Sequence, residues 1–319
     1  MSQRAVVPVA IEEASPGSHA ACVMVVGNFD GVHRGHQAVL NEAVAEAHLR
    51  ALAAIVLTFD PHPAAVVGVG APPLLTTIER RTELMSALGV DRVFVRKFDA
   101  AFAAWSPERF VRELVVQVLG ARLVVVGQNF RFGTKRSGDL ALLRSLGAEI
   151  GFEVRVHHVA SDARGPFSST RAREAIALGD LDEVSRVLGR PHELSGLVVR
   201  GDARGRSLGF PTANLGAVPE MLPPDGVYAV AVDDVLGPGE ARPLGIGVTN
   251  IGVRPTIAGG ARRTVETYLL DFEGDLYDHR LRLHIRTRLR DETKFASLDE
   301  LKAQIALDVA SARVKLGSP

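Results

Sequence analysis

The sequence predicts an α/β protein of two domains: an N-terminal doubly wound parallel sheet, then a small antiparallel β-barrel that ends in a terminal α-helix. The chain has 319 residues, more than one hydrophobic core usually organises. Apolar strand-like runs alternate with helical patterns up to residue 190, which indicates a parallel sheet with right-handed crossovers. Beyond that point, short Val-, Leu- and Thr-rich runs separated by Gly and Pro favour a barrel.

Three segments are expected from the change of composition. Residues 1–20 hold only a mild apolar run, which Pro8 interrupts, so we expect a flexible or loosely attached arm. Residues 21–190 form the first domain and residues 191–319 the second. The turn Gly189-Arg190-Pro191 separates them.

The composition is that of an ordinary globular protein. Lys plus Arg and Asp plus Glu both number 37, so no basic field indicates a nucleic acid or an anionic membrane as partner. The single cysteine, Cys22, lies in an apolar run and is expected to pack in the core. No signal peptide and no apolar run of ~20 residues is seen, so we expect a cytoplasmic protein. The sequence does not indicate an oligomeric state.

The elements of the first domain follow from apolar spacing, capping residues and turn residues. The expected strands are Ala21–Val26, Ala53–Leu57, Arg92–Val95, Leu123–Val126 and Phe152–Val159. The expected helices are Gln37–Arg50, Ile78–Leu88, one from Ser106-Pro107 to Gly120, one from Asp139 to Gly147, and Asp180–Leu188. The loops that follow Val26, Leu57 and Val126 should meet at the carboxyl edge of the sheet, where such folds bind ligands.

The second domain has five apolar runs of strand length and one clear helix. The expected strands are Leu197–Val199, Val227–Val232, Leu244–Val248, Thr264–Leu270 and Leu281–Ile285. A capping box at residues 297–300 opens the last helix. Its apolar stripe should pack on the barrel through Leu301, Ile305, Val309 and Ala312.

The turn Gly27-Asn28-Phe29-Asp30-Gly31-Val32-His33-Arg34-Gly35-His36 links the first strand to the first helix. Free backbone N–H groups and the helix dipole suit such a turn to a phosphate, and glycines let a ligand approach closely. His33 and His36, three residues apart, can face one anion. The alternatives are a tight turn with two surface histidines, or a zinc site to which Asp30 contributes a third ligand.

The whole string resembles the HxGH signature of the nucleotidyltransferase superfamily, in the extended form G-x-F-D-G-x-H-x-G-H. It is similar to that of bacterial bifunctional riboflavin kinase/FAD synthetases, and differs from the P-loop and from the dinucleotide fingerprint. The resemblance implies a Rossmann-like nucleotidyltransferase domain with FMN adenylyltransferase activity. The ATP contacts that it implies are Gly27, Phe29, Asp30, Gly31, His33 and His36.

A second stretch, residues 167–173, adds hydroxyl groups and arginines at a helix start. Thr170 can cap that helix, and an ordinary capped helix with surface arginines is the alternative. By resemblance to the S-S-T-x-x-R segment of the same family, Ser169, Thr170 and Arg173 contact the ATP phosphates. Asn129 is placed near the phosphates or metal by resemblance only. Phe167 stands where the family often has Ile.

The candidate site of the second domain is the stretch Arg200–Asn214. Gly201, Gly205 and Gly209, interleaved with arginines, make a mobile basic loop that could wrap phosphates, or else a plain glycine-rich hairpin. Thr212 and Asn214 share a face of an extended segment, and their oxygens are hard ligands suited to Mg²⁺.

The string L-G-F-P-T-A-N in this stretch resembles the riboflavin kinase signature. The resemblance implies Glu266 as the catalytic base, although a lone strand Glu is more often a solvated edge residue. Tyr268 and Asp278 depart from the family's usual His and Gly. The implied ATP- and flavin-binding residues are Gly201, Gly205, Arg206, Gly209, Phe210, Pro211, Thr212, Asn214, Arg290 and Phe295, with Thr212 and Asn214 on Mg²⁺.

Taken together, these motifs predict a bifunctional enzyme. Its barrel would transfer phosphate from ATP to riboflavin, with Glu266 as base, and make FMN. Its first domain would transfer AMP from a second ATP to FMN, make FAD and release pyrophosphate, with His33, His36 and Arg173 as catalytic groups. Two alternatives stay open: an enzyme with one live site, and a flavin-binding regulator without turnover.

Overall fold

The computed structural model describes residues 6–11, 21–68, 70–201, 209–255 and 261–317. The chain divides into two compact units, Met1–Ser168 and Ser169–Pro319. Each unit is described by itself.

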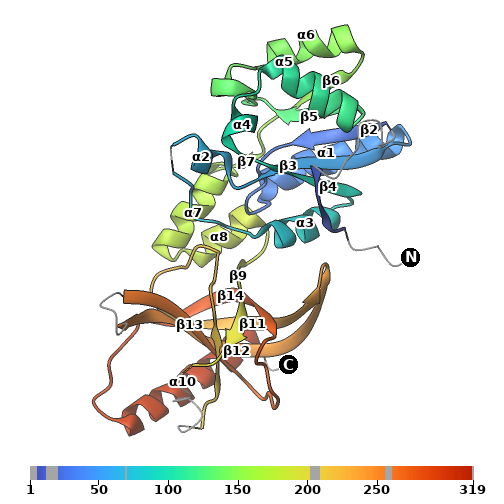
Figure 1. Ribbon diagram of the computed structural model, residues 1–319. Helices are drawn as coiled ribbons and strands as arrows, with labels where there is room; N and C mark the ends of the chain where they lie inside the picture. The colour runs from blue at the N-terminus through green and yellow to red at the C-terminus, as the bar shows by residue number, and fades with distance from the viewer. Residues whose placement is uncertain (1–5, 12–20, 69, 202–208, 256–260, 318–319) are drawn as a thin grey trace. The chain divides into compact units, whose positions relative to one another are not determined.

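The first unit is built on a six-stranded sheet in the order β1-β4-β3-β2-β5-β6, in which every pair of neighbours is parallel (Figure 1). Its strands are β1 Pro8–Ala10, β2 Cys22–Val26, β3 Ala53–Asp60, β4 Arg92–Lys97, β5 Ala121–Gly127 and β6 Glu153–His157. The helices are α1 Arg34–Leu49, α2 Pro63–Val66, α3 Ile78–Ser86, α4 Ala100–Ala103, α5 Pro107–Arg109, the π-helix η2 Phe110–Val118, the 3₁₀ turn η3 Thr134–Arg136 and α6 Leu140–Ile150. A two-stranded ribbon, β7 Ser161–Asp162 and β8 Gly165–Pro166, follows.

Helices cover both faces of this sheet. Successive strand residues point to opposite faces, and in these strands both sets are apolar and must be buried. In β2, Val23 and Val25 pack with α1, whereas Met24 and Val26 pack with η2 and α6. This is the predicted doubly wound arrangement, and it is confirmed. Cys22 is buried beside the Leu119 carbonyl, and burial raises the pKa of its thiol to about 12, so it remains a neutral core group.

One prediction for the N-terminal arm is wrong. Pro8–Ala10 forms β1, which pairs in parallel with the edge of β4, and Ile11 is buried in the core. Pro8 is tolerated because it is the first residue of an edge strand, where its missing N–H costs no ladder hydrogen bond. Residues 1–5 and 12–20 lie outside the described residues.

The second unit contains a closed barrel in the order β10-β13-β12-β11-β14-β9 with antiparallel neighbours (Figure 1). Its strands are β9 His192–Val199, β10 Thr212–Leu215, β11 Gly226–Gly237, β12 Glu240–Pro255, β13 Ala261–Leu269 and β14 Arg280–Arg290. Several of these strands are longer than the apolar runs from which they were predicted. A barrel strand also contains polar residues on its outward face, so an apolar run marks only part of its length. The helices are α7 Ser169–Leu178, α8 Leu181–Leu188 and α10 Leu298–Leu316.

The helices of the second unit extend its core. Helix α10 packs Ala312 against the outside of the barrel, with Val309 and Leu316 beside it, and Ser297 caps it as predicted. Helix α8 places Leu181 in the barrel core, and the compact unit begins at Ser169, the first residue of α7. The expected domain boundary at residue 190 remains a prediction. Thr170 lies inside α7, which begins at Ser169, and is therefore not its capping residue.

Candidate active sites

A cavity of about 270 Å³ opens at the carboxyl edge of the parallel sheet, beside the first turn of α1. Strands β2, β5 and β6 end there, at the point where strand order reverses and doubly wound sheets bind ligands. Its lining includes Gly27, Phe29, His33, Gly35, His36, Asn129, His157 and Phe167. Five of the predicted adenylyltransferase residues therefore meet in one cavity.

The two histidines of the turn form a rigid pair. His33 is the N-cap of α1, and its Nδ1 accepts a hydrogen bond from the backbone N–H of His36 at 3.2 Å. The two rings stack with centroids 3.6 Å apart, and Phe29 meets the His36 ring edge-on at 5.0 Å. The pair is thus fixed at the positive end of the α1 dipole, where an anion is favoured.

His36 is held in its neutral form. Burial, and then the nearby charges of His33 and Arg81, lower its pKa well below the ordinary value. Within the described part of the chain, its buried Nδ1 has no hydrogen-bond partner. A neutral imidazole still carries one N–H, so this ring can donate to an oxyanion without bringing a full charge into the cavity.

Two glycines of the turn are required by its backbone. A Cβ on Gly35 would lie 2.9 Å from the Phe167 carbonyl oxygen and 3.1 Å from the His33 ring. Gly31 has a φ of 81° and donates its N–H to Thr76 Oγ1 at 2.9 Å. Gly35 was not among the predicted ATP contacts. Its closeness to Phe167 and the His33 ring explains why this position of the motif is a glycine.

Asp30 has a structural task in this site. Its carboxylate is buried, accepts hydrogen bonds from the backbone N–H groups of Leu75 and Thr76, and pairs with Arg81 at 3.2 Å. Arg81 also donates to the Asn28 carbonyl at 2.7 Å. Asp30 thereby attaches the turn of the histidine pair to the loop before α3. Its contact with ATP remains a prediction.

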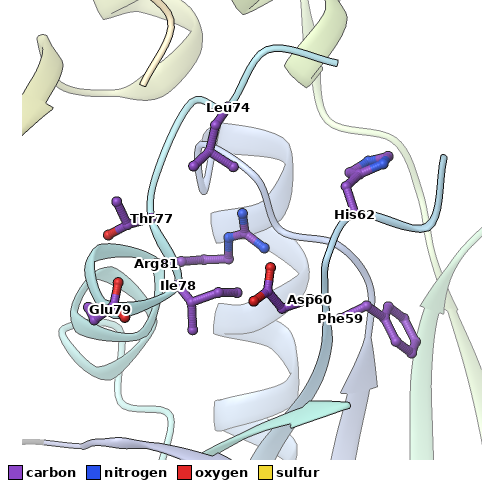
Figure 2. A pocket seen from close by; sticks show the side chains of 8 residues that line it. All are labelled: Phe59, Asp60, His62, Leu74, Thr77, Ile78, Glu79 and Arg81. Atoms are coloured by element: carbon purple, nitrogen blue, oxygen red, sulfur yellow. The ribbon is translucent and has the colours of Figure 1, made fainter. Parts of the chain in front are cut away.

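A second hollow, of about 170 Å³, lies between the end of β3 and the first turn of α3. Figure 2 shows Arg81 reaching from α3 toward Asp60 at the end of β3, with His62 in the loop beyond. Asn28 Nδ2 lies 3.1 Å from His62 Nε2, which joins this loop to the turn of the histidine pair. The sequence analysis predicted that the loop of His62 lies at this edge of the sheet, but it did not predict a pocket there.

The second nucleotide motif lies at the start of α7, in the second unit. Ser169, Thr170 and Arg173 all fall in the first turn and a half of that helix. Phe167, two residues before Ser169, lines the cavity of the histidine pair. The contacts of these three residues with ATP remain a prediction.

The candidate kinase site is a polar row on the outer face of the barrel. Asn214 on β10 lies directly opposite Glu266 on β13, and Glu266 lies directly opposite Asn250 on β12. Residues paired in this way point to the same face. Because Val265 and Leu269 fill the barrel core, the row points outward, and all three of its members are half-buried. Thr264 Oγ1 donates to Glu266 Oε1 at 3.4 Å.

The signature residues before Asn214 surround this row. Thr212 pairs with Tyr268, two residues along the same strands from the Asn214–Glu266 pair. Thr212 and Asn214 therefore share a face, as predicted. The Phe210 ring meets Tyr268 edge-on at 5.3 Å, and Gly209 has a φ of 87°. A Cβ on Gly201 would lie 2.5 Å from the Asn214 amide, so this glycine packs directly on it. Gly205 and Arg206 lie outside the described residues.

A second carboxylate, to which the sequence analysis assigned no role, lies close to this row. Glu292 lies so close to Gly252 that a Cβ there would come 2.2 Å from Glu292 Oε1. Gly252 pairs with Thr264, next to Glu266 on the same face. A glycine in the interior of a strand was the available signal, because it marks a close approach.

Arg290 is engaged within the protein. Its guanidinium binds the buried carboxylate of Asp308 on α10 at 2.9–3.1 Å and stacks over Phe295 at 5.6 Å. The structure thus brings Arg290 and Phe295 together and ties the end of β14 to α10. Their predicted contacts with substrate remain a prediction.

Two family models match consecutive parts of the chain: FAD synthetase over residues 15–171 and riboflavin kinase over residues 188–316. The chain belongs to the bifunctional riboflavin kinase/FMN adenylyltransferase family. The family protein of Escherichia coli K12 is 42% identical over 308 residues, 96% of each chain. That of Pseudomonas fluorescens is 40% identical over 92% of this chain and 93% of its own.

A solved structure agrees with this assignment in fold. A protein of Streptococcus pneumoniae, described as a macrolide-efflux protein, is 28% identical, has a TM-score of 0.82 and is matched over 97% of this chain and 99% of its own. In this chain, the described residues contain no helix that is both long and apolar enough to cross a membrane. The predicted bifunctional flavin transferase is confirmed by the family models and the relatives.

Proposed function

We propose that the two activities of the family are divided between the two sites just described. The observation that carries this proposal is their separation: the stacked His33–His36 pair lies in the first unit and the Asn214–Glu266–Asn250 row in the second. The sheet cavity makes FAD from FMN and ATP, and the barrel face makes FMN from riboflavin and ATP.

In the sheet cavity, a phosphate oxygen of FMN attacks the α-phosphorus of ATP. The new P–O bond forms as the bond to the β-phosphate breaks, and pyrophosphate leaves. The attacking oxygen is already anionic, so no side chain has to remove a proton. The neutral His36 ring, the His33 cap and the α1 N-terminus stabilise the negative charge that develops on the α-phosphate.

On the barrel face, the ribityl hydroxyl of riboflavin attacks the γ-phosphorus of ATP. Its oxygen forms the new bond, the bond to the β-phosphate oxygen breaks, and ADP leaves. Glu266 Oε takes the hydroxyl proton, since it is a strand carboxylate held between Asn214 and Asn250 rather than an edge residue. Such a base contributes about 10²–10⁴-fold.

The donors on β10 fit Mg²⁺. Thr212 and Asn214 offer a hydroxyl and an amide oxygen, which are hard ligands, next to the Glu266 carboxylate. Among the described residues, no group of three His, Cys, Asp or Glu side chains could hold a metal alone. An Mg²⁺ ion at Thr212 and Asn214 would also bind the substrate phosphates and would neutralise phosphate charge when bound.

The test is a reaction of the purified protein with riboflavin, ATP and Mg²⁺, with the flavins separated by chromatography. We expect FMN first and then FAD, and neither product once the metal is removed with a chelator. A protein that binds riboflavin but forms no FMN with Mg²⁺ present would be a regulator. A protein that stops at FMN would have one live site.

A further inference from the structure

A carboxylate beside the kinase row has no part in the chemistry above. Glu292 follows β14 in the segment that leads to α10, and its side chain lies over Gly252 on β12. A Cβ on Gly252 would come 2.2 Å from Glu292 Oε1 and 2.9 Å from Oε2, so the glycine is what leaves room for this carboxylate. Within the described residues, Glu292 is exposed and forms no hydrogen bond and no ion pair.

The segment that carries Glu292 is held in place by its neighbours. Arg288 pairs with the Asp291 carboxylate at 2.8 Å, and Arg290 donates to the Asp291 carbonyl at 2.9 Å. Arg290 also stacks over the Phe295 ring at 5.6 Å. The backbone is therefore fixed on both sides of Glu292, while the oxygens of its own carboxylate stay available to accept hydrogen bonds from a ligand.

The register of β13 places the groups of the kinase site in order. Thr264 lies opposite Gly252 and so marks the Glu292 end, Glu266 follows two residues later, and Thr212 is paired two residues beyond Glu266. Alternate strand residues share a face and are about 7 Å apart. The proposed base is therefore central, with the Thr212 hydroxyl on one side of it and the Glu292 carboxylate on the other.

The two ends of this order suit different substrates. The ATP phosphates are anions, so they belong beside the hydroxyl and amide oxygens that suit Mg²⁺, away from a further carboxylate. Riboflavin is uncharged, and the secondary hydroxyls of its ribityl chain can each donate a hydrogen bond to a carboxylate. When the terminal hydroxyl lies at Glu266, the rest of the chain can extend along β13 to Glu292.

We propose that Glu292 accepts hydrogen bonds from the secondary hydroxyls of the ribityl chain and so selects flavins that carry a polyol side chain. The inference rests on the proposed phosphorylation of riboflavin on this face of the barrel. Glu292 is a specificity-determining residue, because it holds the chain whose terminal hydroxyl reaches Glu266. Gly252 contributes through its missing side chain, which lets the carboxylate lie close to the strand.

The experiment compares two acceptors of phosphate from ATP with the full-length protein. One is riboflavin, and the other is the same isoalloxazine with a 5-hydroxypentyl side chain, which keeps the terminal hydroxyl and lacks the secondary ones. The wild type should prefer riboflavin, as a ratio of kcat/KM values. Glu292→Ala should reduce this ratio by about ten- to hundredfold, the worth of hydrogen bonds to a charged group, through a loss on riboflavin alone. Glu292→Gln should lose less, because its amide oxygen still accepts.

Gly252→Ala tests the geometry independently. Its methyl group would take the place of the Glu292 carboxylate, so this variant should lose the same preference as Glu292→Ala. In the double variant the two losses should not add, since the carboxylate that the methyl group displaces is already absent. The matched control is Glu240→Gln, which removes an exposed carboxylate at the other end of β12 and should leave the ratio unchanged.

Several results would overturn the inference. An equal loss on both acceptors in Glu292→Ala means that the carboxylate acts on a group that they share, and a loss that added Mg²⁺ restores assigns it to the metal. An unchanged ratio, with the hydroxypentyl flavin still phosphorylated to show that the barrel is folded, means a solvated side chain. A wild type that uses both acceptors equally has no polyol reader. If the wild type phosphorylates neither, the proposed function itself fails.

Discussion

The two candidate sites are assembled in different ways. The site in the sheet comes mainly from one continuous string, Gly27–His36, whose strand, turn and helix cap are fixed locally. The site on the barrel comes from strands far apart in sequence, where antiparallel register places Asn214, Glu266 and Asn250 in one row. A site of the first kind depends on one turn, whereas one of the second kind depends on the pairing of three strands.

The largest effect is expected at the barrel, from Glu266→Gln. The change keeps the shape of the row and removes the proton acceptor, so kcat for FMN formation should fall by about 10²–10⁴-fold. Riboflavin should still bind, since the lost interaction belongs to the transition state. Steady-state rates and a flavin-fluorescence titration measure the two effects. Near-normal FMN formation would exclude Glu266 as the base.

His36→Ala gives the matching test in the sheet. Because it removes a fixed donor from the developing phosphate charge, FAD formation from FMN should fall by about 10²–10³-fold. FMN formation from riboflavin serves as the internal control and should stay unchanged. If FAD were formed at the normal rate, the histidine pair would be a structural part of a tight turn.

Part of this difference could be read from the sequence. The local string predicted the strand–turn–helix unit and the ligand site at the sheet edge, because neighbouring residues determine them, whereas the capping role of His33 came from the structure. The signature on β10 predicted that Thr212 and Asn214 share a face, since strands alternate. The pairing of Asn214 with Glu266, and the approach of Glu292 to Gly252, depend on register and closure of the barrel, which one strand does not encode.

The sequence also did not indicate the structural role of Asp30. Asp30 stands in the motif, yet its carboxylate binds Leu75, Thr76 and Arg81. These partners are 45 to 51 residues away, and no local pattern joins them. The Pro8–Ala10 strand was missed for a similar reason, because an edge strand of three residues has almost no periodicity.

The Asp30–Arg81 pair gives a third test, on stability. Arg81→Met leaves the buried Asp30 carboxylate without its cation, and should lower the free energy of unfolding by about 3–5 kcal/mol. The control is Arg112→Met, which breaks a half-exposed pair with Glu149 and should cost about 0–1 kcal/mol. Urea unfolding measures both. Equal, small losses would show that the turn does not depend on this anchor.

The smallest effect is a pH dependence of stability from His36. Its folded-state pKa is lowered, so below about pH 6.5 the unfolded chain binds more protons than the folded one, and stability falls as pH falls. The loss should reach about 1 kcal/mol on going from pH 6.5 to 5.5. His36→Asn should show a flatter profile in thermal melts. Parallel profiles would contradict the assignment of a neutral, buried ring.

The central claim is that one chain carries two complete and separate sites. Its most direct test mixes equal amounts of Glu266→Gln and His36→Ala with riboflavin, ATP and Mg²⁺, and measures FAD. Each variant alone should form almost none, because the first lacks FMN and the second cannot adenylylate it. The mixture should form FAD readily, since FMN made by His36→Ala is consumed by the intact sheet site of Glu266→Gln. A mixture that forms no more FAD than the separate variants would contradict the claim.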